Sequence, residues 1–103
     1  MVTDNQGNVL SLEIGDTVQV RGSEELYTKY GVDKDGFIVC GNETFLPQMT
    51  SFCGLIANVT KVYTSKKGKP FRIVRLEGDM TLPWSAYKFS YEMLKEVDGK
   101  VKE

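Results

Sequence analysis

The densest group of side chains able to do chemistry lies between residues 61 and 75. This stretch contains six basic residues and no acid, with two aromatic rings among them. Basic side chains bind phosphate groups, and an aromatic ring can stack on a base. The pattern predicts a basic β-hairpin that binds nucleic acid or a nucleotide, or that meets an acidic protein. The residues proposed for phosphate or nucleic-acid binding are Lys61, Tyr63, Lys66, Lys67, Lys69, Arg72 and Arg75.

The same cations have a simpler interpretation. Lysines at an exposed hairpin tip favour solubility and discourage the pairing of strand edges. The whole chain has a formal net charge of −1, whereas nucleic-acid-binding domains are commonly basic. The charge is nevertheless uneven: residues 1–52 carry eight acids and three bases, and residues 53–103 carry six acids and ten bases. Both interpretations therefore stay open.

Aromatic side chains form a second candidate surface. Two of them lie in the polar stretch of residues 22–36, and three lie near the end of the chain. Aromatic residues brought together by loops can line a groove that binds a peptide. A single tryptophan in a small domain is also commonly a core residue, so Trp84 fits either role. The residues proposed to contact a protein partner are Tyr27, Tyr30, Trp84, Tyr87 and Tyr91.

Enzymatic chemistry finds little support in the sequence. The chain has no histidine and only two cysteines, Cys40 and Cys53, both in apolar surroundings that favour buried free thiols. A zinc site needs about four ligands, and nucleophile–histidine pairs need a histidine. Residues 33–36 resemble part of a calcium loop, but the distal glutamate is missing. We therefore expect no catalytic residue, no metal and no cofactor.

The length of 103 residues predicts one domain with a single core. We expect a flexible segment over residues 1–9, a folded domain over 10–97 and a flexible tail over 98–103. No apolar run is long enough to span a bilayer, and the amino terminus lacks the features of a signal peptide. The expected compartment is the cytoplasm, without membrane association.

Alternating apolar residues predict short strands. Leu10, Leu12 and Ile14 share one face of the first, and a second follows over residues 17–21. The stretch 54–77 predicts a hairpin whose apolar side other segments must cover. Its first strand changes phase near residues 60–61, which predicts a β-bulge.

The other segments are expected to be less regular. Residues 22–36 predict a long exposed loop with at most one helical turn, capped by Ser23. Phe45, Met49 and Phe52 share one face of a short helix that would fill the core. Residues 80–89 predict a further strand, and residues 90–94 a helical turn capped by Ser90.

Together these elements predict a mainly β fold, a small and strongly bent antiparallel barrel with one or two short helical turns. The stretch Ile14-Gly15-Asp16-Thr17-Val18-Gln19-Val20-Arg21 resembles the opening strand of SH3-like barrels. The spacing of aromatic, methionine and small residues from Phe45 to Val62, followed by Ser90-Tyr91-Glu92-Met93-Leu94, is similar to small SH3-like proteins of bacteriophages and prophages, and to Mib-Herc2-type SH3-like modules.

This resemblance implies an SH3-like fold and a phage or prophage origin, hence a bacterial host cell, and it supplies no reaction. The function expected from the sequence is that of a non-catalytic binding module acting through protein–protein contacts, with self-association at an exposed strand as one form of it. The alternative is nucleic-acid or nucleotide binding by the basic hairpin of residues 61–75.

Overall fold

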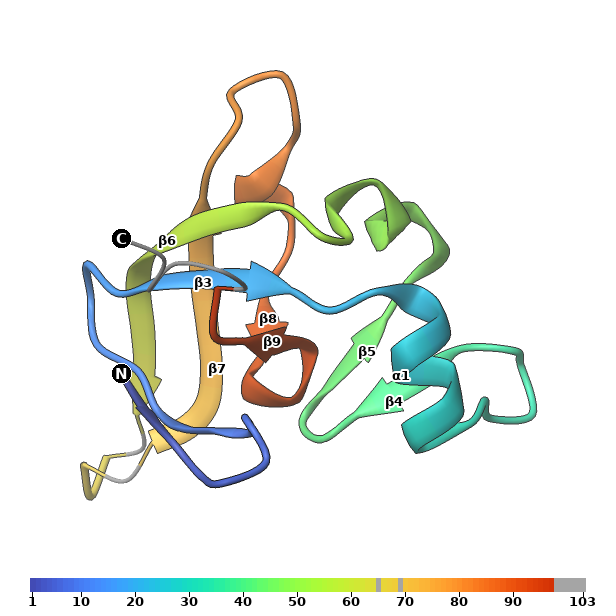
Figure 1. Cartoon of the computed structure of the whole chain (residues 1–103), viewed down its shortest axis with the longest axis horizontal. Coiled ribbons are helices and arrows are strands. Elements are labelled where there is room, and N and C mark those ends of the chain that lie inside the picture. The colour runs from blue at the N-terminus through green and yellow to red at the C-terminus, as the bar shows by residue number, and fades with distance from the viewer. Residues whose placement is uncertain (65, 69, 98–103) are drawn as a thin grey trace.

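The fold is mainly β, as the sequence predicts. The computed structural model describes residues 1–64, 66–68 and 70–97 (Figure 1). Its strands are β1 (Val2–Thr3), β2 (Val9–Ser11), β3 (Thr17–Val20), β4 (Ile38–Cys40), β5 (Glu43–Phe45), β6 (Ile56–Thr64), β7 (Pro70–Glu77), β8 (Phe89–Ser90) and β9 (Leu94–Lys95). Its helices are α1 (Ser23–Tyr30) and three short 3₁₀ helices, η1 (Pro47–Phe52), η2 (Trp84–Ala86) and η3 (Tyr91–Met93).

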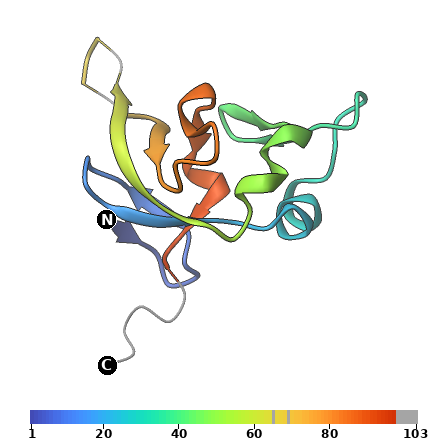
Figure 2. The same ribbon diagram turned by 90° about the horizontal axis from the view of Figure 1, so that it is seen from above.

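The central sheet has five strands in the order β8-β7-β6-β3-β9, and every neighbouring pair is antiparallel. Strand β6 curves strongly along its length (Figure 2). Two small sheets accompany the central one, β1 with β2 and β4 with β5. The edge strands β8 and β9 are joined in the chain by the three residues of η3.

The predicted hairpin and its bulge are both confirmed. Strands β6 and β7 pair in the register Val59↔Leu76 and then Lys61↔Arg75, so one extra residue stands on β6 between these pairs. A bulge bends a strand and increases its twist. The bend lets a nine-residue strand follow the curved core instead of extending past it.

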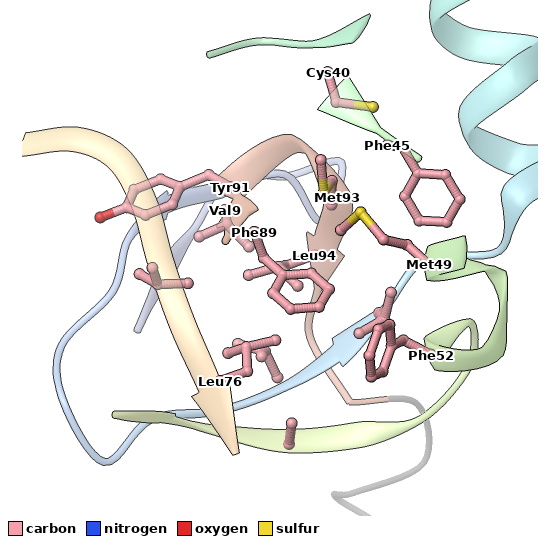
Figure 3. Close-up of a cluster of buried hydrophobic side chains, with 14 of the residues drawn as sticks. Val9, Cys40, Phe45, Met49, Phe52, Leu76, Phe89, Tyr91, Met93 and Leu94 are labelled. Carbon is pink, nitrogen blue, oxygen red and sulfur yellow. The ribbon is translucent and has the colours of Figure 1, made fainter. Parts of the chain in front are cut away.

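The predicted short helix is confirmed as η1, which begins at Pro47, but Phe45 lies before it as the last residue of β5. Proline suits the start of a helix because its missing N–H would be unpaired there anyway. The side chains of Phe45, Met49 and Phe52 are all buried. They point into the core beside Phe89, as Figure 3 shows.

Aromatic rings fill the core next to η1. The ring centroid of Phe52 lies 4.5 Å from that of Trp84 and 5.5 Å from that of Phe89. Tyr87 packs edge-on against the same ring at 5.6 Å. The indole N–H of Trp84 donates to the carbonyl of Asp79 at 2.9 Å, which satisfies its buried polar atom. This cluster ties the loop of residues 78–88 to η1.

The prediction of a loop with one helical turn over residues 22–36 is wrong in extent. Helix α1 has eight residues, and it buries Leu26 against the core. The predicted Ser23 cap is also wrong, because Gly22 is the N-cap and no side chain caps the helix. One buried leucine among polar neighbours leaves too weak a periodic signal to predict two turns.

Two strand predictions also need correction. In the first strand Val9 and Leu12 are buried, whereas Leu10 and Ile14 are exposed. Strand β2 ends at Ser11, and the chain then turns, so alternation does not continue to residue 14. Of the strand predicted over residues 80–89, only its last residue lies in a strand, β8, because the chain forms turns and η2 before it.

The chain ends differ in what the structure describes. Residues 1–9, expected to be flexible, contain β1 and the first residue of β2, and the amino group of Met1 lies 3.1 Å from a carboxylate oxygen of Asp16. The expected tail, 98–103, lies outside the described residues. Among the described helices, none is long and apolar enough to cross a membrane. The turn predicted over 90–94 is η3, although Ser90 makes no capping hydrogen bond with its side chain.

Candidate functional site

The five side chains predicted to contact a partner lie in three places. Tyr27 and Tyr30 are on α1, where Tyr27 is 57% exposed. Trp84 and Tyr87 belong to the aromatic core cluster, and Trp84 is only 4% exposed. Tyr91 lies on η3 and is only 3% exposed. Of the five, Tyr30 and Tyr91 line one cleft together.

This cleft, called here the Tyr30–Tyr91 cleft, has a volume of about 300 Å³. Its lining comes from segments far apart in the sequence: the β1–β2 hairpin, the end of β3, helix α1, the start of β7, and η3. Its lining includes Asn8, Leu10, Arg21, Lys29, Arg72 and Glu92. A partly buried concave site with a few fixed polar groups has the usual form of a ligand-binding pocket.

Arg72 joins the basic stretch of the sequence to this cleft. Its Nε and Nη2 atoms donate to Oε2 of Glu92 at 3.3 and 3.1 Å. The guanidinium carbon lies 5.0 Å from the ring centroid of Tyr91, within the range of a cation–π contact. Arg72 has a φ of 63°, and it is the one non-glycine residue with a positive φ in the described part of the chain. With the backbone in this left-handed conformation, the side chain of Arg72 lies beside Tyr91 and Glu92.

Glu92 is also held from its other side. The turn between β4 and β5 passes so close that a Cβ atom on Gly41 would lie 2.5 Å from Oε1 of Glu92. That oxygen is buried, and it has no hydrogen-bond partner among the described residues. The absent side chain at Gly41 therefore makes room for the carboxylate that orients Arg72.

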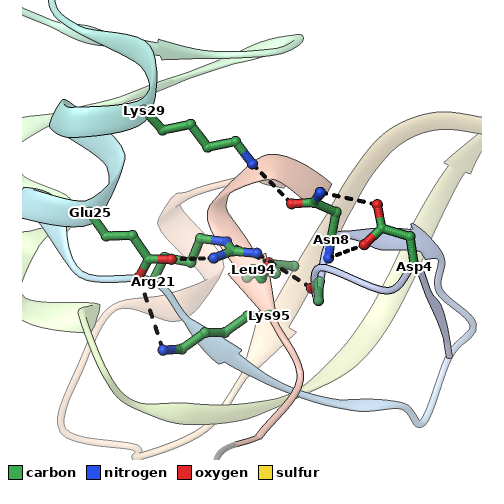
Figure 4. A network of polar contacts seen from close by, with 8 residues as sticks. Asp4, Asn8, Arg21, Glu25, Lys29, Leu94 and Lys95 are labelled. Carbon is green, nitrogen blue, oxygen red and sulfur yellow. Dashed lines mark hydrogen bonds and ion pairs between the residues drawn. The ribbon is translucent and has the colours of Figure 1, made fainter.

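Arg21 lines the cleft and makes the polar contacts that Figure 4 shows. This buried side chain donates from Nε to the carbonyl of Leu94 at 3.1 Å and forms an ion pair with Glu25 on α1. Its Nη2 reaches the carbonyl of Gly7 at 3.4 Å. One guanidinium therefore connects β3 with α1, β9 and the β1–β2 turn, and such fork-shaped donors suit this role.

Asn8 links the β1–β2 turn to helix α1. Its side-chain oxygen accepts from Nζ of Lys29 at 2.9 Å, and its backbone N–H and amide nitrogen donate to Asp4 (Figure 4). These hydrogen bonds from Asn8, the side-chain one first, lower the pKa of Asp4. Burial, followed by the charge of Glu92, raises the pKa of Tyr30, so this phenol stays neutral in the cleft.

The six predicted cations do not form one surface. Arg72 belongs to the Tyr30–Tyr91 cleft, while Lys66 and Lys67 are exposed at the hairpin turn. Lys69 lies outside the described residues. Lys61 and Arg75 both contact Tyr63, and neither belongs to the hairpin turn that holds Lys66 and Lys67.

The group around Tyr63 includes a residue that the sequence reasoning missed, Lys88. The ammonium groups of Lys61 and Lys88 lie 5.0 and 5.2 Å from the centroid of the Tyr63 ring. Nε of Arg75 donates to the Tyr63 hydroxyl at 3.0 Å. That hydrogen bond, helped by the three positive charges, lowers the pKa of Tyr63. The only sign of it in the sequence was that Lys88 lies within the strand predicted over residues 80–89; its place beside Arg75 follows from the pairing of β8 with β7.

A second, more apolar cleft of about 340 Å³ lies beside β7 and the loop that follows it. Met80, Leu82 and Trp84 line it, together with Arg75 and Glu77. Trp84 is thus a core residue with one edge at a cleft. The cleft that Trp84 lines shares no lining residue with the Tyr30–Tyr91 cleft, so the two clefts are separate.

The cysteines match the sequence prediction of free thiols. Cys40 is buried and Cys53 half-buried, and both are unpaired. Burial, followed by the charge of Glu92, raises the pKa of Cys40 to about 11, and burial also raises that of Cys53. A thiol that stays protonated at neutral pH is a poor nucleophile. Within the described ranges, no three His, Cys, Asp or Glu side chains are grouped so that they could hold a metal ion.

Comparison with known proteins adds no relative. No protein-family model, no curated protein and no solved structure matches the chain.

Proposed function

We propose that this chain is an SH3-like barrel that acts by binding a segment of a partner protein in the Tyr30–Tyr91 cleft. The observation that carries the proposal is the assembly of Tyr30, Arg72 and Tyr91 in one cleft from three elements far apart in the sequence. Aromatic and cationic contact groups are present there. Such a lining suits recognition of a ligand.

The order of the strands supports the SH3-like part of the proposal. Strand β3, which holds half of the motif resembling SH3-like barrels, pairs with β6 on one side and β9 on the other. At the opposite edge, β8 passes into β9 through η3 alone. A three-residue connection between the two edge strands keeps those edges close, as closure of a small barrel requires.

The exposed groups of the cleft favour a partner segment with both apolar and acidic side chains. Leu10 is exposed and Tyr30 half-exposed, so an apolar side chain can be buried between them. Lys29 has no carboxylate partner among the described residues, and the side chain of Arg72 keeps 40% of its surface exposed. An acidic residue of the partner would therefore meet two cations.

A selection of peptides tests this proposal. The full-length protein is immobilised, a library of random peptides is passed over it, and the strongest binder is measured against variants by fluorescence anisotropy. We expect Tyr30→Ala to weaken binding about tenfold or more, because it removes an aromatic contact at the centre of the site. Selected peptides should carry an acidic residue near an apolar one.

Tyr27→Ala is the matched control. It removes the same side chain from the same helix, but Tyr27 does not line the cleft. Binding within about twofold of the unchanged protein is expected for a surface change outside the site. Equal losses in both variants, or a selected peptide that ignores Tyr30, would contradict the proposal. Thermal melts of both variants show whether the fold is retained.

A further inference from the structure

We infer that Tyr63, Lys61, Arg75 and Lys88 form a binding site for a phosphate-bearing chain, namely the backbone of single-stranded nucleic acid. This site, called here the Tyr63 cluster, is separate from the Tyr30–Tyr91 cleft, because none of its residues lines that cleft. It differs from the basic stretch of the sequence in leaving out Arg72 and the hairpin tip, and in adding Lys88.

The register of the strands brings three cations together. Lys61 on β6 stands directly opposite Arg75 on β7. On the other side of β7, Val74 pairs with Phe89, and one further step of the same antiparallel register brings Lys88 next to Arg75. Three cations therefore form a row across three neighbouring segments of the sheet. Like charges directly opposite each other in a sheet destabilise it.

Among the described residues, no ion pair neutralises the positive charge of this row. The ion pairs of the described residues join Met1 to Asp16, Arg21 and Lys95 to Glu25, and Arg72 to Glu92. None of them involves the three cations of the Tyr63 cluster. Natural sequences tend to break such local rules at functional sites. A bound anion would supply the missing negative charge.

The central cation, Arg75, is held in place by hydrogen bonds. Arg75 donates from Nε to the Tyr63 hydroxyl, and from Nη1 to the carbonyls of Ser85 and Tyr87, the latter at 3.4 Å. A fixed guanidinium loses little entropy when it binds an anion. The pKa of Tyr63 is lowered first by the hydrogen bond from Arg75 and then by the charges of Arg75, Lys61 and Lys88, which agrees with a positive potential at this position. The exposed lysines on either side can close on phosphates along a chain.

The test measures binding of a fluorescent oligothymidylate of about 15 nucleotides to the full-length protein at low salt, by anisotropy. The variant Lys61→Gln/Lys88→Gln keeps Arg75, whose loss could disturb the loop that it holds. We expect this variant to bind about tenfold or more weakly, with the slope of log affinity against log salt reduced by about 1.4, since each phosphate contact contributes about 0.7.

The matched control is Lys34→Gln/Lys66→Gln, which removes the same charge from two other exposed lysines. Affinity within about threefold of the unchanged protein is expected for the control, because only general attraction is reduced. Equal weakening in both double variants would overturn the inference, and so would an unaffected Lys61→Gln/Lys88→Gln protein.

Calorimetry with tripolyphosphate distinguishes the source of the phosphate. Binding of tripolyphosphate that is lost in Lys61→Gln/Lys88→Gln, together with oligothymidylate binding, supports the site as stated. Tripolyphosphate binding without oligothymidylate binding would overturn the assignment to nucleic acid. Saturable binding of neither probe would overturn the site altogether. A positive result here is independent of the peptide experiment, since the two sites share no residue.

Discussion

At the level of single residues, Glu92 makes two contacts beside the Tyr30–Tyr91 cleft, with Arg72 and with the β4–β5 turn. One carboxylate oxygen receives both hydrogen bonds from Arg72, and the other lies buried against the β4–β5 turn. Its charge also contributes to the raised pKa of Tyr30 and of Cys40. A change at any of these positions should therefore be felt by the others.

A glycine substitution tests the contact with Glu92. Gly41 has a φ of 70°, and Gly36 has a φ of 87° with nothing near its missing Cβ. Alanine at either position strains the backbone and should cost about 1 kcal/mol. Gly41→Ala also collides with Glu92, so we expect about 1–2 kcal/mol more in urea unfolding. Equal losses for Gly41→Ala and Gly36→Ala would contradict this contact.

The thiol of Cys40 should make stability depend on pH in the alkaline range. Its pKa is about 11 in the folded protein against 9.0 for a free thiol. As pH rises from 9 towards 11, the unfolded chain loses a proton that the folded chain keeps, so unfolding becomes easier. Below pH 9 the thiol is protonated in both the folded and the unfolded chain, so the protein keeps the full stability that is lost at higher pH.

The comparison of the unchanged protein with Cys40→Ala isolates this effect, because all other groups titrate in both. We expect the free energy of unfolding of the unchanged protein to fall more steeply, by at most about 1 kcal/mol per pH unit. Parallel curves in denaturant melts between pH 8 and about 11 would show that the thiol ionises normally in the folded state.

At the level of elements, apolar spacing predicted the segments that are positioned by burial of their apolar side chains. Met49 and Phe52 identified η1, although Phe45, predicted on the same helical face, lies in β5, and the phase change near residue 60 identified the bulge in β6. Helix α1 was missed because it buries one leucine and also depends on polar contacts of Glu25 with Lys95 and of Lys29 with Asn8, which are distant in sequence. Such contacts leave no periodic trace in a sequence.

Arg21 connects four of these elements and gives a prediction at this scale. Arg21→Met leaves the carbonyl of Leu94 and the carboxylate of Glu25 without this partner. We expect a loss of about 2–4 kcal/mol of stability, with earlier hydrogen exchange in α1. Lys95→Met is the control, since Lys95 meets the same carboxylate at 4.0 Å near the surface. Its cost should stay below about 1 kcal/mol. Similar costs for both variants would contradict the connecting role.

At the level of the whole molecule, residue types suited to binding could be predicted from the sequence, but their grouping could not. Tyr30, Tyr91 and Arg72 were each singled out, yet for two different surfaces, and the structure joins them in one cleft. Lys88 was missed although it completes the Tyr63 cluster. The grouping depends on which strands are neighbours and on their register, and these follow from packing of the whole chain.

The central claim is that a partner segment binds between α1, β7 and η3. The most direct measurement is a heteronuclear NMR titration of the labelled full-length protein with the strongest peptide from the selection. The account predicts that the largest shifts fall together on the backbone amides of Leu10, Tyr30 and Arg72, while those of Met80 and Leu82 in the other cleft stay unchanged. Shifts centred on Met80 and Leu82, with none at Tyr30, would contradict it.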